Sequence, residues 1–293
     1  MTKILVGIDG SPAAQSALEW SAQLATRDGF ELIAARVFVS PQAELPPDED
    51  ARLHDEQRRE LERWCSAIPA GMTRPRPVLR DGDPLEELLV AASKVGADML
   101  VVGAPGAGRH PRVHLGGVAH HLAHHSNIPL AIVPAGSAPR IDNVVLGVDG
   151  SPGSLIAAEF GAELARGLAV PVTAVYAFEP FVAEWTTDDA FSWKRQAEAD
   201  ARSWSAPVEQ TGLRLNVDVD RDIHPVAAIA RALACRPRSI AVLGTHGHTG
   251  FAELHLGHVP FQLLYDTAAT VVVVPARDGD LLARSHTAAS AGH

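Results

Sequence analysis

Hydrophobic and polar positions follow two patterns along this chain: short runs of apolar residues, and longer stretches in which apolar residues recur at helical spacing. In the first half, the short runs predict strands near Lys3–Ile8, Glu31–Phe38, Arg76–Leu79, Met99–Val102 and Leu130–Val133. The stretches between them predict helices at about Pro12–Arg27, Asp50–Ala67, Pro84–Val95 and Gly116–His125. This alternation is typical of βα units, and nearly continuous apolar runs indicate a parallel sheet with helices on both faces.

The same series occurs a second time, beginning with a strand near Asn143–Val148 and ending with one near Thr270–Val274. The segment Ile4–Pro12 (ILVGIDGSP) recurs 140 residues later as Val144–Pro152 (VVLGVDGSP). Three further segments recur in the same order: RDGDP as RDIHP, GxxG as GxxG, and LAIVP as VVVVP. We therefore predict an α/β protein of two tandem doubly wound domains, 1–135 and 142–276, with a linker at 136–141 and a loose C-terminal tail at 277–293.

Composition and charge narrow the classes of function. Lys and Arg total 25 against 35 Asp and Glu, a net charge of −10, which argues against nucleic acid as a partner. Two cysteines, Cys65 and Cys235, with no CxxC spacing indicate neither a disulfide framework nor a zinc site. The apolar run before Asp9 is too short for a signal sequence or a membrane span, so we expect a cytoplasmic protein that does not insert into membranes.

Candidate binding residues stand where a doubly wound sheet binds ligands, after the first and fourth strands of each half. Glycine loops follow both fourth strands: GxxG, nine residues, and then a Gly that opens a helix, whose free N–H groups attract phosphate. The candidates in the first half are Gly7, Asp9, Gly103, Gly106, Arg109, Gly116 and Gly117. Those in the second half are Gly147, Asp149, Gly244, Gly247, Gly257 and His258.

The first half begins with Val-Gly-x-Asp-Gly-Ser and the second with Leu-Gly-x-Asp-Gly-Ser, and each carries Gly-x2-Gly-x9-Gly between its fourth and fifth strands. This combination resembles the ATP-binding universal stress protein family. The similarity covers about residues 1–134 and 141–275, as in tandem two-domain members. It implies the strand order 3-2-1-4-5 and a nucleotide, ATP with Mg²⁺, whose phosphates lie on the glycine loop. It also implies that adenine lies near Asp9 and Val37 in one half and near Asp149 and Val175 in the other.

The sequence departs from the family pattern at one position of each half. Where the pattern has Ser or Thr, the chain has Gly117 and His258, so neither half offers a hydroxyl to the phosphates. One neutral hydrogen bond contributes about 0.5–1.5 kcal/mol net, so we expect roughly tenfold weaker binding rather than none. His258 can donate to phosphate in its place, more strongly when protonated, which predicts a pH-sensitive second site.

Three other motifs suggest different chemistry. Residues Gly103 to His110 imitate a P-loop but place Arg109 and His110 where lysine and a hydroxyl residue are required. His255 to His258 spell HxGH, as in nucleotidylyltransferases, but before strand five rather than after strand one. The pairs His120/His124 and His121/His125 have metal-ligand spacing, yet no acidic or cysteine ligand lies nearby in the sequence, so we expect no metal site.

No nucleophile with a base is evident, since Ser11 and Ser151 stand at helix-cap positions, so we expect no enzymatic activity beyond slow ATP hydrolysis. The sequence therefore predicts a nucleotide-dependent regulatory protein of the stress response, acting through a protein partner that the sequence does not identify. The alternatives are a nucleotide-free scaffold and, less favoured, an enzyme of nucleotidyl or phosphate transfer. The resemblance also implies pairing of domains through their fifth strands, and a homodimer of the chain.

Overall fold

The computed structural model describes residues 3–26, 30–39, 46–104, 116–178, 187–221, 224–245 and 256–276. The chain divides into two compact units, unit 1 (Met1–Arg140) and unit 2 (Ile141–His293), and this division falls within the segment 136–141. Gly136 in that segment has φ +78°, a conformation that glycine adopts without strain. The predicted tail, 277–293, lies outside the described residues.

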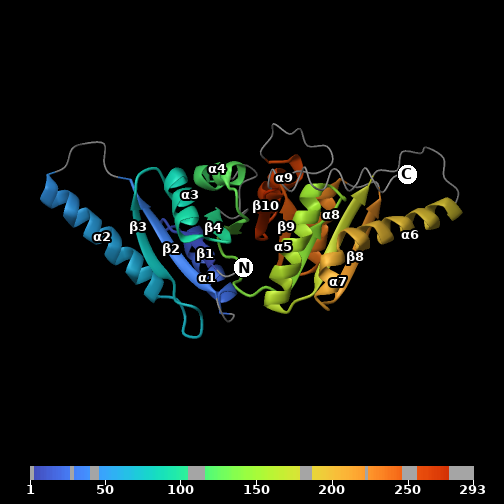
Figure 1. Ribbon diagram of the computed structural model, residues 1–293, viewed down its shortest axis with the longest axis horizontal. Coiled ribbons are helices and arrows are strands. Elements are labelled where there is room, and N and C mark those ends of the chain that lie inside the picture. The colour runs from blue at the N-terminus through green and yellow to red at the C-terminus, as the bar shows by residue number, and fades with distance from the viewer. Residues whose placement is uncertain are drawn as a thin grey trace. The chain divides into compact units, whose positions relative to one another are not determined.

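Unit 1 alternates strands and helices along the chain (Figure 1). Its elements are β1 (Lys3–Gly7), α1 (Pro12–Leu24), β2 (Glu31–Phe38), α2 (Pro47–Ser66), β3 (Arg76–Asp81), α3 (Pro84–Val95), β4 (Met99–Ala104), α4 (Gly117–His125) and β5 (Leu130–Pro134). Its strands are parallel and ordered β3-β2-β1-β4-β5, which confirms the predicted fold and strand order.

Unit 2 repeats this arrangement with one additional short helix. Its elements are β6 (Asn143–Gly147), α5 (Pro152–Leu168), β7 (Val172–Phe178), α6 (Thr187–Trp204), α7 (Ala206–Gln210), β8 (Leu215–Arg221), α8 (Pro225–Cys235), β9 (Ser239–Gly244), α9 (His258–Asp266) and β10 (Val271–Val274). The parallel order is β8-β7-β6-β9-β10, the same as in unit 1.

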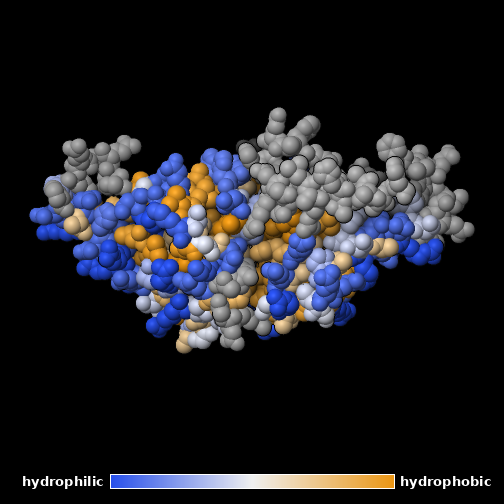
Figure 2. Space-filling view, viewed as in Figure 1, coloured by the Kyte–Doolittle hydropathy of each residue, from blue (hydrophilic) through white to orange (hydrophobic). Residues whose placement is uncertain are grey.

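The strands at the centre of each sheet carry the core. Ile4, Leu5 and Val6 of β1 and Met99 and Leu100 of β4 have no exposed surface, although their side chains alternate between the two faces of the sheet. Helices must therefore cover both faces, as the continuous apolar runs predict. In unit 1, α2 packs on β2 and β3 and α1 on β4 and β5, while α3 packs on β1 and β2 and α4 on β4 and β5. The outer surface of α2 is strongly hydrophilic (Figure 2).

Helix starts follow the local sequence closely. Ser11 and Ser151 are N-caps, and each side chain accepts a hydrogen bond from the backbone N–H three residues later, at 3.2 Å. A proline follows each cap at the first helical position, where its missing N–H leaves no bond unmade. Two helix boundaries without such a Ser-Pro signal differ from the prediction. The C-terminus of α1 lies at Leu24 rather than Arg27, and the N-terminus of α2 lies at Pro47 rather than Asp50.

None of the helices in the described part of the chain is both long enough and apolar enough to span a bilayer.

Candidate functional site

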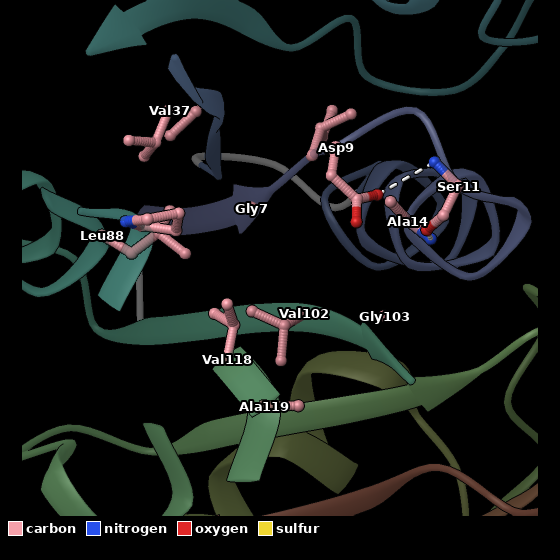
Figure 3. Close-up of a pocket in the computed structure, with 13 residues that line it drawn as sticks. Gly7, Asp9, Ser11, Ala14, Val37, Leu88, Val102, Gly103, Val118 and Ala119 are labelled. Carbon is pink, nitrogen blue, oxygen red and sulfur yellow. Dashed lines mark hydrogen bonds between the residues drawn. The ribbon is translucent and has the colours of Figure 1, made fainter. Parts of the chain in front are cut away.

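A pocket of about 190 Å³ opens at the carboxyl ends of β1, β2 and β4 in unit 1 (Figure 3). The first turns of α1, α3 and α4 complete its walls. Sheets of this topology bind ligands at this edge, where the strand order reverses between β1 and β4. The lining residues are Gly7, Ile8, Asp9, Ser11, Ala14, Ala35, Val37, Pro84, Leu88, Val102, Gly103, Val118 and Ala119.

Asp9 supplies a carboxylate to this pocket. It lies in the turn between β1 and α1, its side chain is exposed, and its Oδ1 accepts the backbone N–H of Ser11 at 2.9 Å (Figure 3). Gly10 makes the turn possible with φ +86°, and the ring of Trp64 from α2 lies over it, leaving no room for a Cβ. The carboxylate is therefore held in place by one backbone donor while it remains accessible to a ligand.

The remaining walls of the pocket are apolar. Val37 comes from β2, Leu88 from α3, Val102 from β4 and Val118 from α4, and Figure 3 shows their side chains on both sides of the end of β1. Val118 is 37% exposed, which places it at the mouth. Apolar walls with one carboxylate and nearby backbone groups are typical of a site for a small molecule.

The first turn of α4 contributes backbone donors. Gly116 is the N-cap and makes no side-chain capping bond, while Val118 and Ala119 line the pocket. In any α-helix the first N–H groups have no partner within the helix, and with the helix dipole they attract anions. A Cβ on Gly117 would meet nothing within 4 Å, so this residue leaves open space at the start of the helix.

Gly103 has a packing role that the sequence did not indicate. A Cβ at this position would lie 2.3 Å from the backbone carbonyl carbon of Ala13 in α1. Its counterpart Gly244 is as close to Gly153, at 2.5 Å. Both glycines therefore allow the first helix of the unit to rest directly on the end of the fourth strand, and they shape the site through this close approach.

The corresponding aspartate of unit 2 has more hydrogen-bond partners. Asp149 Oδ1 accepts both the backbone N–H of Ser151, at 2.9 Å, and the Ser151 hydroxyl, at 2.5 Å. The Asp149 N–H donates to Ser154 Oγ at 3.4 Å, and Ala14 of unit 1 stands where Ser154 stands. The carboxylate of Asp149 is half-buried and tied to the start of α5, whereas that of Asp9 is exposed.

The two valines predicted to contact adenine do not occupy equivalent positions. Gly7 pairs in register with Ala35, whereas Gly147 pairs with Val175, so Val175 corresponds to Ala35. The counterpart of Val37 is Ala177. The 140-residue offset of the repeat gives the same correspondence, so Val37 and Val175 stand at different depths along their strands. That each of them lies near adenine stays a prediction.

His258 begins α9, with Gly257 as its N-cap. Its ring lies edge-on to that of His224, the N-cap of α8, with 5.5 Å between the ring centroids. His224 Nδ1 accepts the Val226 N–H at 3.4 Å, so in the neutral ring Nε2 carries the hydrogen. Asp83 and Gly117 occupy these two positions in unit 1, so the helix starts of the units differ in chemistry.

Three predicted binding residues, Gly106, Arg109 and Gly247, lie outside the described residues, as do His110 and His255 of the alternative motifs. Within the described ranges, no group of three or more His, Cys, Asp or Glu side chains is placed to hold a metal ion.

Burial raises the pKa of the Cys65 thiol to about 11, which keeps it protonated and unsuited to nucleophilic attack.

Sequence reasoning found Gly7, Asp9, Val37 and Gly103 but missed the other nine of the thirteen lining residues. The missed residues include Ala35, Leu88, Val102, Val118 and Ala119. Ala35 could have been found from the alternation of β2, since it lies on the same side as Val37. Leu88 could not, because its place depends on how α3 packs against β1 and β2.

The sequence profile of the Universal stress protein family matches residues 1–134 and 140–275. Similar sequences include Universal stress protein Rv1996 of Mycobacterium tuberculosis, 27% identical over 92% of this chain and 94% of that protein. Universal stress protein Rv2623 of the same organism is 29% identical over 92% of this chain and 95% of that protein. A crystal structure of a universal stress protein from Archaeoglobus fulgidus has a similar fold, with a TM-score of 0.67, 17% identity and coverage of 93% and 98%.

Proposed function

From the premise that this chain belongs to the universal stress protein family, we propose that the pocket of unit 1 binds an adenine nucleotide, ATP with Mg²⁺, and that this binding regulates a partner protein. One observation carries the proposal: the exposed carboxylate of Asp9 and the first turn of α4 face the same apolar pocket. A carboxylate accepts the amino or hydroxyl hydrogens of a nucleoside, and helix N–H groups suit phosphate.

The size of the pocket suits the nucleoside part of the ligand and leaves the phosphates outside it. A volume of about 190 Å³ is below the roughly 300–1,000 Å³ of sites for whole drug-sized ligands, and suits the base and sugar. The phosphates would then extend toward Gly116 and Gly117 at the start of α4. Because the protein carries a net charge of −10, Mg²⁺ would offset part of the repulsion of the phosphates.

Calorimetry with ATP and Mg²⁺, on the wild type and on Asp9→Asn, tests the proposal. A hydrogen bond to a charged group contributes about 1.5–3 kcal/mol, so the substitution should weaken binding roughly 10- to 150-fold. Asp98→Asn is the matched control: Asp98 accepts the Lys3 N–H at 2.9 Å at the opposite end of β1 and should leave affinity unchanged. Absence of binding by the wild type at millimolar ATP would contradict the proposal.

A nucleotide-free scaffold is the second candidate, favoured by Gly117 and His258, which supply no hydroxyl at the helix starts. Thermal unfolding separates the two. A ligand at 100 times its dissociation constant stabilises the folded state by about 2.7 kcal/mol, so ATP should raise the unfolding temperature. A scaffold would show the same unfolding temperature with and without ATP, ADP or AMP. Under the main proposal, phosphate release should not exceed a slow background.

Homodimer formation and a regulatory partner stay predictions. A light-scattering mass near twice 31.0 kDa would support the homodimer, and ATP-dependent retention of a partner on immobilised protein would support regulation. A monomer mass at all concentrations would contradict the first.

A further inference from the structure

We propose that each chain binds one nucleotide, in unit 1, because Val175 and Leu243 fill the inner end of the corresponding crevice in unit 2. The inner end is the part of the crevice beside Gly7 in unit 1 and Gly147 in unit 2. This inference rests on the proposed function and deepens it, since the aspartate and the glycines of the motif are present in both units and do not say which unit binds.

The second strand of each unit supplies the first difference. In unit 1 the residue paired with Gly7 is Ala35, and the valine, Val37, stands two residues nearer the mouth. In unit 2 the valine itself, Val175, pairs with Gly147, and the residue nearer the mouth is Ala177. The units therefore carry the same two residue types in reversed order. The branched side chain forms the outer wall in unit 1 and fills the inner end in unit 2.

The fourth strand supplies the second difference. Val102 follows Val101 on the strand beside β1, and Leu243 follows Val242 on the strand beside β6, so the two residues correspond in register. A Cβ on Gly7 would lie 3.4 Å from Val102 Cγ1, whereas a Cβ on Gly147 would lie 2.4 Å from Leu243 Cδ2. Leu243 thus reaches further over the glycine than Val102 does, into the space where a ligand would meet the strand.

The helix that covers this part of the sheet does not compensate. Leu88 of α3 approaches the Cβ position of Gly7 to 3.1 Å, and Ile229 of α8 approaches that of Gly147 to the same 3.1 Å. Since these two helix side chains stand equally close to the glycines, the additional atoms of Val175 and Leu243 are not offset by more space on the helix side of the crevice. Protein interiors do not yield readily to such additions, because they are already closely packed.

The two aspartates also favour binding in unit 1 over binding in unit 2. Asp149 accepts two hydrogen bonds from Ser151, one of them from the hydroxyl, and lies half-buried. Asp9 accepts the Ser11 N–H and is exposed. A ligand in unit 2 would have to compete with a bound serine hydroxyl for the carboxylate, whereas a ligand in unit 1 would not.

Stoichiometry and labelling test the inference. Calorimetry with ATP and Mg²⁺ should give one site per chain, and photolabelling with azido-ATP followed by peptide mass spectrometry should modify peptides of unit 1. Two sites per chain, or label in both units, would overturn this inference and leave the proposed function standing. Label in unit 2 alone would overturn both. Absence of any binding would overturn both.

Reciprocal exchanges test the named residues. Val175→Ala with Leu243→Val should create a second site and raise the stoichiometry from one to two. Ala35→Val with Val102→Leu should weaken binding in unit 1 about tenfold or more. Circular dichroism must show that each variant is folded, and the two exchanges are independent, so failure of one to fold leaves the other. A folded Val175→Ala/Leu243→Val protein that still binds one nucleotide would overturn the assignment to these side chains.

Discussion

Gly103 at the end of β4 lies against the backbone of Ala13 in α1, so closely that a Cβ on the glycine would be 2.3 Å from the carbonyl carbon of Ala13. The contact is between backbone atoms of a strand and a helix, and neither can move away as a flexible side chain could. It holds the N-terminal turn of α1, with Asp9 and Ser11 before it, against the strand that forms the other side of the pocket.

Gly103→Ala should therefore destabilise unit 1 by about 1–3 kcal/mol, the usual cost of forcing extra volume into a packed site. Urea unfolding would measure the change. Gly117→Ala is the matched control from the same motif, since nothing lies within 4 Å of its Cβ position, and it should change stability by less than about 0.5 kcal/mol. Equal effects of the two substitutions would contradict the packing role of Gly103.

The two N-cap serines should differ in their contribution to stability. Ser11→Ala removes a cap, which costs about 0.5–2 kcal/mol. Ser151→Ala should cost more, because Ser151 is 2% exposed and its hydroxyl also donates to Asp149. Urea midpoints of both variants would measure the order. Ser11→Asp, which keeps a capping oxygen, should recover most of the loss, and the reverse order of the two alanine variants would contradict the prediction.

The two cysteines should react at very different rates. Cys235 is exposed, whereas Cys65 is buried and its pKa is raised to about 11 by burial and by nearby Glu62. At pH 8 a chromogenic disulfide reagent should modify one thiol per native chain and two in denaturant, and Cys235→Ser should abolish the rapid reaction. Rapid modification of both thiols in the native protein would disagree with this assignment.

The raised pKa of Cys65 also fixes the direction of a pH effect. Well below the ordinary thiol pKa of 9.0 the thiol is protonated in both the folded and the unfolded state, so its contribution to stability is complete there. Above that pH the unfolded chain loses the proton first, and the contribution is lost as the pH rises toward about 11. Cys65→Ala should therefore reduce the fall in the free energy of unfolding at alkaline pH. The same alkaline fall in the wild type and in Cys65→Ala would contradict this prediction.

Tyr176 of β7 should titrate above the ordinary tyrosine value. Burial raises its pKa, and the negative charges of Asp200 and Asp149 raise it further. The chain has two tyrosines, so Tyr265→Phe leaves Tyr176 as the single reporter for ultraviolet titration. Asp200→Asn in that background should lower the pKa of Tyr176 without returning it to 10.0, because burial is the larger cause. If Tyr176 titrates at 10.0 in the Tyr265→Phe variant, before Asp200 is replaced, the predicted rise of its pKa is contradicted.

Local sequence signals located most of the fold. The Ser-Pro pairs mark the starts of α1 and α5, and the strands agree with the apolar runs to within two residues, since both features depend on neighbours in the chain. Gly106, Arg109 and Gly247 stay predictions, because residues 105–115 and 246–255 lie outside the described part of the chain. Within the described part, Asp9, Gly7 and Gly103 do lie at one pocket, because the carboxyl ends of adjacent parallel strands meet at one edge.

By itself the sequence determined the duplication, the two βα series and the aspartate and glycine positions, because repeated motifs and periodicity are written in consecutive residues. Tertiary structure alone decided that Val175 lies beside Gly147, at the inner end of its crevice, and that Leu88 closes the pocket of unit 1. Strand register and helix packing join residues distant in the chain, and a shift of two residues along a strand leaves the apolar pattern unchanged while it moves a side chain from the mouth of the crevice to its inner end.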